Sequence, residues 1–135
     1  MKWLQSTKGN YVANNENRIG VYTYSSGTLN LVASSSNDGT LWSTATSATL
    51  GSKAFSSTYT AAQGMYYVGF LYSALSATTA PILGGGPVIG SGAGIGDFTN
   101  SGKIVGQLAA QTVLPASVAM SSVASIGSNF FLGLY

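Results

Sequence analysis

Short strand-like runs separated by glycine and serine are the feature that most constrains the fold of this chain. Residues 18–24 are rich in β-branched and aromatic side chains, and residues 28–33 form a second such run after a loop that ends in Gly27. Two runs of this kind around a short glycine-containing loop predict a β-hairpin. Leu29 and Leu31 alternate with polar residues, so one face of the second strand is expected to be apolar.

Further strand-like runs follow at short spacing along the chain. Residues 52–57 alternate in polarity, and residues 129–135 form a last apolar and aromatic run. Residues 65–72 are apolar on both faces, which predicts a central strand covered on both sides. Weaker signals predict a short strand at residues 88–89, a strand or a helical turn at residues 104–108, and a short helix at residues 115–124.

No helical pattern longer than about two turns occurs, so strands carry the predicted fold. Strands at short spacing with glycine- and serine-rich turns are typical of β-sandwiches and jelly rolls. A length of 135 residues suits one domain and allows a core without disulfides. The sequence therefore predicts a single all-β domain over residues 1–135, an antiparallel and jelly-roll-like β-sandwich.

The residues needed for most enzyme chemistry are missing from this chain. It contains no histidine and no cysteine, which excludes a Ser-His-Asp triad, a thiolate nucleophile and the usual zinc sites. A glycosidase needs two carboxylates around one bond, and Asp38 and Asp97 stay open as such a pair. We expect a protein that is not an enzyme and that uses no metal or other cofactor.

Two segments resemble ligand-binding loops but lack the required pattern. Residues 37–40 offer oxygen ligands without the spaced carboxylates of a calcium loop, which favours a β-turn. Residues 96–104 resemble a phosphate-binding loop, but five residues separate the glycines instead of four. Ile104 also replaces the Ser or Thr that would bind Mg²⁺. A plain loop is expected at both places.

Charged side chains are sparse, at 6% of the residues against about 25% in ordinary domains. A net charge of +2 from scattered groups argues against a nucleic-acid partner. The purest apolar run, residues 65–71, is far shorter than the roughly 20 residues of a membrane-spanning helix, and no apolar region of a signal peptide is seen. Neutral polar groups therefore form the surface, which suits contact with carbohydrate or with copies of the same chain.

Aromatic side chains are the remaining candidates for a binding site. Trp42, Tyr24 and Tyr59 are the candidate glycan-contact residues, because aromatic rings offer flat apolar surfaces for stacking on sugars. Trp42 stands beside a polar loop and is expected to be exposed, whereas the tyrosines of the run 65–72 are expected to be buried. Ordinary packing in the core or in a subunit interface is the alternative for all of them.

Segments spread over most of the chain resemble a known family. They comprise the strand–turn–strand at residues 17–34, the Asn37-Asp38-Gly39 turn with Leu41-Trp42, and residues 53–56, 64–68, 97–101, 114–117 and 133–135. The family is the β-sandwich modules of tailed-phage virion proteins, found at the ends of minor tail proteins, tail fibres and capsid fibres. The resemblance implies a jelly-roll-like module on the virion surface, where it decorates the particle or binds host-surface glycans. The implied partners are copies of the chain, favoured as a homotrimer, and other virion proteins.

One departure from the family concerns the first strand. Such modules usually have further strands upstream of the segment that matches Trp3, whereas this sequence starts at Met1. Missing strands would leave an open sheet edge, so we expect neighbouring chains to complete the sheet, unless the sequence is one part of a larger product. Two other functions remain open: a free carbohydrate-binding module and a self-polymerising extracellular fibre protein.

Overall fold

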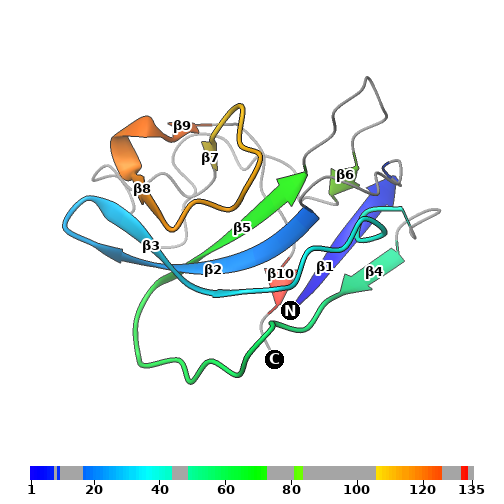
Figure 1. The fold of residues 1–135 in the computed structure, drawn as a ribbon, viewed down its shortest axis with the longest axis horizontal. Helices are drawn as coiled ribbons and strands as arrows, with labels where there is room; N and C mark the ends of the chain where they lie inside the picture. Colours follow the sequence, from blue (N-terminus) through cyan, green and yellow to red (C-terminus); the bar gives the residue numbers. More distant parts are fainter. Residues whose placement is uncertain are drawn as a thin grey trace, which may run out of the picture.

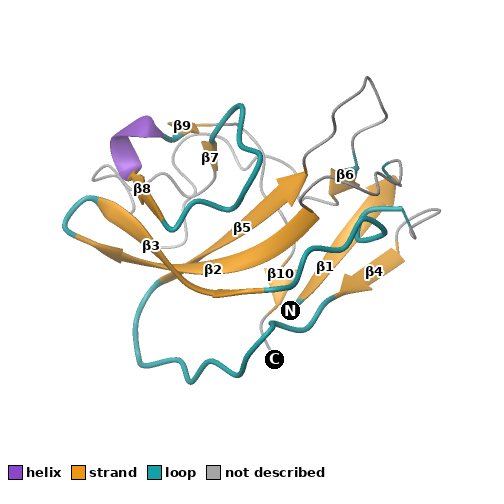
Figure 2. Ribbon diagram, viewed as in Figure 1, coloured by secondary structure: helices purple, strands orange, loops and turns teal. Residues whose placement is uncertain are grey.

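Antiparallel β-strands form nearly all of the regular structure of the chain. The computed structural model describes residues 1–7, 9, 17–43, 49–72, 81–83, 106–125 and 132–133. Within these residues the only helical element is the 3-10 turn η1 (Met120–Ser122), as Figure 2 shows. The strands are β1 (Lys2–Thr7), β2 (Asn17–Ser25), β3 (Thr28–Ser34), β4 (Thr49–Ser52), β5 (Tyr66–Tyr72), β6 (Ile82–Leu83), β7 (Gly106–Gln107), β8 (Ser117–Ala119), β9 (Ala124–Ser125) and β10 (Leu132–Gly133) (Figure 1).

These strands form two four-stranded sheets and one two-stranded ribbon. In the first sheet, β1 pairs with β4 along one edge and with β10 and β6 along the other. In the second sheet the order is β5-β2-β3-β8, and β7 pairs with β9 in the ribbon. Every pairing between the described strands is antiparallel. The predicted all-β, antiparallel, sandwich-like fold is confirmed.

The predicted hairpin is confirmed as β2 and β3, which a two-residue turn connects. Ser26 and Gly27 have φ angles of 48° and 81°. Two positive φ angles are required by type I′ turns, whose twist suits the flanking strands. Leu29 and Leu31 pair with Tyr24 and with the tyrosine two residues before it, so they share one face as the alternation predicts.

Among the described strands, β2 and β3 are the inner strands of the second sheet and β5 lies at its edge. β2 pairs with β5 on one edge and with β3 on the other, and its residues 19–22 are all buried. In the described part of the chain β5 pairs with β2 alone. Among the described strands, the segment predicted as a central strand over residues 65–72 is thus an edge strand. An apolar run indicates that the two faces of a strand are covered. It does not indicate whether other strands pair with its two edges.

The two sheets share an interior built around two tryptophans. Trp3 of β1 packs edge-on against Trp42, with ring centroids 5.4 Å apart, and both rings contact Phe70 of β5 at 6.1 and 5.6 Å. Ile19 of β2 and Leu41 are buried in the same cluster. Edge-to-face contacts are favoured between aromatic rings, because the positive edge of one meets the negative face of another. This cluster joins β1, β2, β5 and the turn before Trp42.

The opposite face of the second sheet is covered by the segment that precedes β8. The Leu114 side chain lies close to Gly20 and Gly69, where an added Cβ would meet it at 3.0 and 3.7 Å. The Tyr22 hydroxyl donates a hydrogen bond of 3.1 Å to the carbonyl of Pro115. Burial raises the pKa of Tyr22 to about 12, so the hydroxyl stays protonated at physiological pH. β2 is thus covered on both of its faces.

The helix predicted over residues 115–124 is wrong, because this segment forms β8, η1 and β9. Its backbone bonds to residues far away along the chain. The amide of Leu31 donates to the carbonyl of Ala116 at 2.9 Å, and the amide of Met120 donates to the carbonyl of Gly27 at 2.8 Å. These bonds attach the segment to β3 and to the hairpin turn, and such tertiary contacts override a weak helix propensity.

Other predicted strands differ in their extent. The strand predicted over residues 52–57 is wrong except at Ser52, because β4 ends there and residues 53–57 form a loop. The segment 104–108, predicted as a strand or a helical turn, contains the short strand β7 in its described part. Of the strand predicted over residues 129–135, the structure describes only β10. The strand predicted at residues 88–89 lies outside the described residues.

Candidate functional site

Trp42 is buried, with 2% of its surface exposed, so the prediction that it is exposed is wrong. Its indole nitrogen donates a hydrogen bond of 3.1 Å to the carbonyl of Leu71. Its own carbonyl accepts hydrogen bonds of 2.7 Å from the side chain of Gln5 and from the amide of Gly9. An indole ring that is buried and hydrogen-bonded in this way is part of the core, and it leaves no surface for stacking on a sugar.

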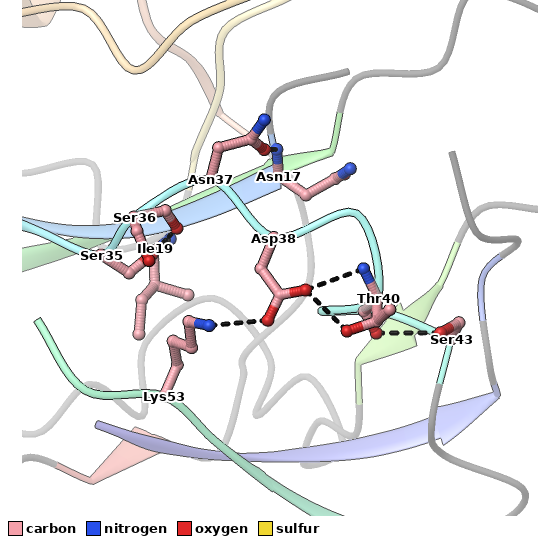
Figure 3. A network of polar contacts seen from close by, with 9 residues as sticks. All are labelled: Asn17, Ile19, Ser35, Ser36, Asn37, Asp38, Thr40, Ser43 and Lys53. Atoms are coloured by element: carbon pink, nitrogen blue, oxygen red, sulfur yellow. Dashed lines mark hydrogen bonds and ion pairs between the residues drawn. The ribbon is translucent and has the colours of Figure 1, made fainter. Parts of the chain in front are cut away.

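The turn that buries Trp42 is organised by Asp38. One carboxylate oxygen of Asp38 accepts hydrogen bonds from the amide and the hydroxyl of Thr40, at 2.9 and 2.6 Å. The other forms a 2.6 Å ion pair with Lys53 (Figure 3). The amide of Leu41 donates to the carbonyl of Asp38 at 3.0 Å. The turn predicted at residues 37–40 is confirmed, and it directs Leu41 and Trp42 into the interior.

The Asp38 carboxylate has a structural role in this network. Hydrogen bonds from Lys53 and Thr40 lower the pKa of Asp38 to about 2. Both carboxylate oxygens are bound within the chain, so this group is poorly placed to hold a cation or to transfer a proton. Asp97, its predicted partner in a carboxylate pair, lies outside the described residues.

Polar residues 35–37 extend the edge of β2 beyond the end of β3. The amide of Ile19 donates to the hydroxyl oxygen of Ser35 at 3.2 Å, and the amide of Ser35 donates to the carbonyl of Ile19 at 2.9 Å. The amide of Asn17 donates to the side-chain oxygen of Asn37 at 2.8 Å (Figure 3). Side chains thus replace strand pairing here and lead the chain to the Asp38 turn.

Tyr24 and Tyr67 form an accessible aromatic pair on the outer face of the second sheet. Tyr24, near the end of β2, is 49% exposed. Its ring centroid lies 6.4 Å from that of Tyr67, near the start of β5, with the ring planes tilted by 53°. Tyr67 pairs with Tyr22, two residues before Tyr24, so the two rings are diagonal neighbours on one face.

A second tyrosine pair lies on the other face of the same strand. Tyr59, in the loop before β5, packs edge-on against Tyr66 with ring centroids 6.2 Å apart. The Tyr66 hydroxyl donates a hydrogen bond of 2.8 Å to the carbonyl of Ala62. A side-chain hydrogen bond with Tyr66 raises the pKa of Tyr59, so this hydroxyl is neutral at physiological pH. Met65, which immediately precedes β5, is 55% exposed.

We call these residues the tyrosine end: Tyr24, Tyr59, Met65, Tyr66 and Tyr67. They gather where β5 starts and β2 ends, beside the β2–β3 hairpin (Figure 1). Two predicted candidates, Tyr24 and Tyr59, belong to the group, whereas Trp42 does not. Tyr66 and Tyr67 are partly exposed rather than buried as predicted. The group offers aromatic faces and phenolic hydroxyls, which suit stacking and hydrogen bonding.

One cavity of about 210 Å³ opens elsewhere on the outer face of the second sheet. It is lined by Arg18, Leu31, Ser34, Val113 and Leu114. Ligand pockets commonly enclose about 300–1,000 Å³, so this hollow is small for a ligand site. The Arg18 guanidinium also donates a hydrogen bond of 3.3 Å to the carbonyl of Ser35. We assign the cavity to the packing of the segment before β8.

The described residues also bear on metal binding and on membrane insertion. Among them, no group of three or more acidic, histidine or cysteine side chains is placed to hold a metal ion. No helix in the described ranges is long and apolar enough to cross a bilayer. The tyrosine end therefore remains the strongest candidate for a functional surface.

Comparisons with known proteins leave the function to be argued from these residues. No family model matches the chain. No curated protein and no solved structure matches it either. The tyrosine end, the buried tryptophan core and the sheet edges are thus the features from which a function can be inferred.

Proposed function

We propose that this chain is a virion structural protein, a fibre head or a capsid or tail decoration module, that binds host-surface glycans. The observation that carries the proposal is the tyrosine end, where two aromatic pairs reach the surface from both faces of β5. The antiparallel β fold agrees with such a module. The resemblance of the sequence to phage virion modules supplies the virion setting.

Tyrosine suits recognition of sugars for physical reasons. Its ring is a large apolar surface that packs on the C–H face of a pyranose, and its hydroxyl exchanges hydrogen bonds with sugar hydroxyls. Only two side-chain torsions are immobilised on binding, so the entropic cost is low. In the tyrosine end, the neighbouring rings already limit the motion of each other. A partly preformed surface of this kind loses less entropy when a ligand binds.

A role without catalysis is part of the proposal. The chain has no histidine or cysteine, and Asp38 is bound to Lys53 and Thr40. In the tyrosine end, a side-chain hydrogen bond with Tyr66 raises the pKa of Tyr59, which makes that hydroxyl a weaker acid. Binding and display therefore describe its chemistry better than turnover does.

Assembly with copies of itself is also part of the proposal, and β4 supports it. Among the described strands β4 pairs only with β1, and its Leu50 side chain is 70% exposed. An edge strand with an exposed leucine is prone to pair with another chain. We favour a homotrimer in which neighbouring chains cover this edge, on a virion that also supplies other structural partners.

Native mass spectrometry tests the assembly. We expect a trimer for the wild type, and a shift towards monomer for Leu50→Lys, since a charge on this edge opposes pairing. Val113→Lys, at a 50% exposed residue of the segment before β8, is the matched control and should leave the trimer intact. A monomeric wild type that binds glycans would favour the free carbohydrate-binding module. Open filaments would favour the self-polymerising fibre.

A glycan array tests the binding. Wild-type protein should bind, and Tyr24→Ala should bind about two- to tenfold more weakly, because one ring contact is worth about 0.5–1.5 kcal/mol. Val113→Ala removes a comparably exposed apolar side chain elsewhere and should bind like the wild type. Folded Tyr24→Ala that binds every glycan as well as the wild type does would count against the tyrosine end.

A further inference from the structure

We infer that the tyrosine end takes an uncharged oligosaccharide that crosses β5 and contacts both tyrosine pairs, and this inference rests on the proposed function. One sugar ring packs on the pair formed by Tyr24 and Tyr67, and a later ring packs on the pair formed by Tyr59 and Tyr66. The ligand class is thus a neutral glycan longer than one sugar.

The two pairs stand on opposite sides of one strand. Tyr66 and Tyr67 are consecutive residues of β5, and successive side chains of a strand point to opposite faces. Each of the two carries its own aromatic neighbour, at 6.2 and 6.4 Å. A single sugar ring can cover one of these pairs. A ligand that uses both has to pass around the strand, which requires a chain of sugars.

The start of β5 leaves a route for such a ligand. In the described part of the chain, β2 occupies one edge of β5 and no strand pairs with the other. Met65, at the start of this edge, is more than half exposed. Its thioether is an adaptable apolar contact, suited to the part of the ligand that lies between the two pairs.

The charge distribution selects a neutral ligand. The charged residues in the described ranges are Lys2, Arg18, Asp38 and Lys53. Asp38 and Lys53 are paired with each other, and Lys2 lies in the first sheet. Arg18 is six residues before Tyr24 on β2, a distance of roughly 20 Å along a strand. None of these cations lies at the tyrosine end, where an acidic sugar would need one.

Protonation also favours an uncharged site. The pKa of Tyr59 is raised by its hydrogen bond with Tyr66, so the Tyr59 hydroxyl stays neutral well above physiological pH. The five residues of the tyrosine end include no Asp, Glu, Lys or Arg. Binding should therefore be nearly independent of pH between about pH 5 and pH 8, and nearly independent of salt because no ion pair is screened.

The test is an array of the full chain on matched glycans. It carries galactose-, glucose-, mannose- and N-acetylglucosamine-based oligosaccharides from monosaccharides to hexasaccharides, each with a sialylated or uronic-acid counterpart. We expect neutral oligosaccharides to bind about two- to tenfold better than their monosaccharides, because they gain a second ring contact. Adding an acidic sugar should give no gain, and high salt should leave binding unchanged.

Variants assign the two contacts. Tyr24→Ala and Tyr59→Ala should each reduce binding of the neutral oligosaccharides, and the double variant should bind them no better than monosaccharides. Tyr24→Phe keeps the ring and should retain most of the binding, which separates ring stacking from loss of folding. Val113→Ala is the surface control.

Each other outcome overturns a distinct statement. Binding that requires sialic or uronic acid, or that fails at high salt, overturns the neutral ligand while the proposed glycan-binding function stands. Equal affinity for monosaccharides and oligosaccharides, or an unaffected Tyr59→Ala, overturns the span across β5. No binding to any glycan overturns the proposed glycan-binding function itself.

Discussion

Replacing Gly51 by alanine should destabilise the fold, because Gly51 of β4 lies against the indole ring of Trp3. The two residues are paired across β4 and β1. A Cβ at residue 51 would meet the indole nitrogen of Trp3 at 2.6 Å and two of its ring carbons at no greater distance. Non-bonded carbon atoms pack at about 3.5–4.0 Å, so the ring or the strand has to move by about 1 Å.

The expected cost follows from the surroundings of Trp3. The ring is buried and is held between Trp42 and Phe70, so it has little room to move. Overpacking of a closed core costs about 1–3 kcal/mol. Alanine also lowers the entropy of the unfolded chain relative to glycine, which returns about 0.4–1 kcal/mol. We expect a net loss of about 1–2 kcal/mol in the free energy of unfolding.

Denaturant titration followed by tryptophan fluorescence measures this loss, since both tryptophans lie in the core. Gly64→Ala is the matched control, because Gly64 is exposed and an added Cβ there would meet no atom within 4 Å. It should unfold at the same denaturant concentration as the wild type or slightly above it. Gly51→Ala that is as stable as Gly64→Ala would refute the close packing of Trp3 on β4.

Three further predictions test the hairpin turn, the ion pair and the cover of the outer face. Gly27→Ala places a side chain at a φ of 81° and should lower the free energy of unfolding by about 1 kcal/mol. Gly27→Asn should lower it less, because Asn tolerates this conformation. Equal denaturant midpoints for the two variants would contradict the turn. Asp38 has a folded pKa of about 2, below its usual 3.8, so its stabilisation is complete above about pH 5 and is lost as the pH falls through 2. Because solvent screens this quarter-exposed ion pair, the free energy of unfolding of the wild type should exceed that of Asp38→Asn by only about 1 kcal/mol at pH 6, as measured by denaturant titration. A difference in the free energy of unfolding that persists below pH 2 would contradict the stabilising role of the ionised Asp38. Tyr22→Phe leaves the carbonyl of Pro115 without its donor and should cost about 1 kcal/mol; an unchanged melting temperature would show that this bond contributes nothing.

The hairpin was predictable because its signals are local. The alternation of Leu29 and Leu31 and the glycine at the turn are visible within one short segment. The position of β5 was not predictable in this way, because pairing along strand edges is a property of the whole sheet. The segment 115–124 likewise depends on bonds to Leu31 and Gly27, which no local pattern contains.

The candidate site was predictable in part, and Trp42 shows why the rest was not. It follows a polar loop in the sequence, yet the Asp38 turn rotates it into the core together with Leu41. The bonds that fix this turn come from Thr40 and from Lys53, which is fifteen residues away. The adjacent positions of Tyr66 and Tyr67 in the sequence indicate that the site extends to both faces of the strand. Two consecutive tyrosines in a strand point to opposite faces, so each could bring an aromatic ring to a different surface of the sheet.

A nuclear magnetic resonance titration with a neutral oligosaccharide tests the central claim most directly. The ring resonances of Tyr24, Tyr59, Tyr66 and Tyr67 are followed together with the indole N–H signals of Trp3 and Trp42. We predict that the tyrosine signals shift until saturation, while both indole signals stay in place because the tryptophans are buried and hydrogen-bonded. A shift of the Trp42 indole with unmoved tyrosine rings would contradict the account.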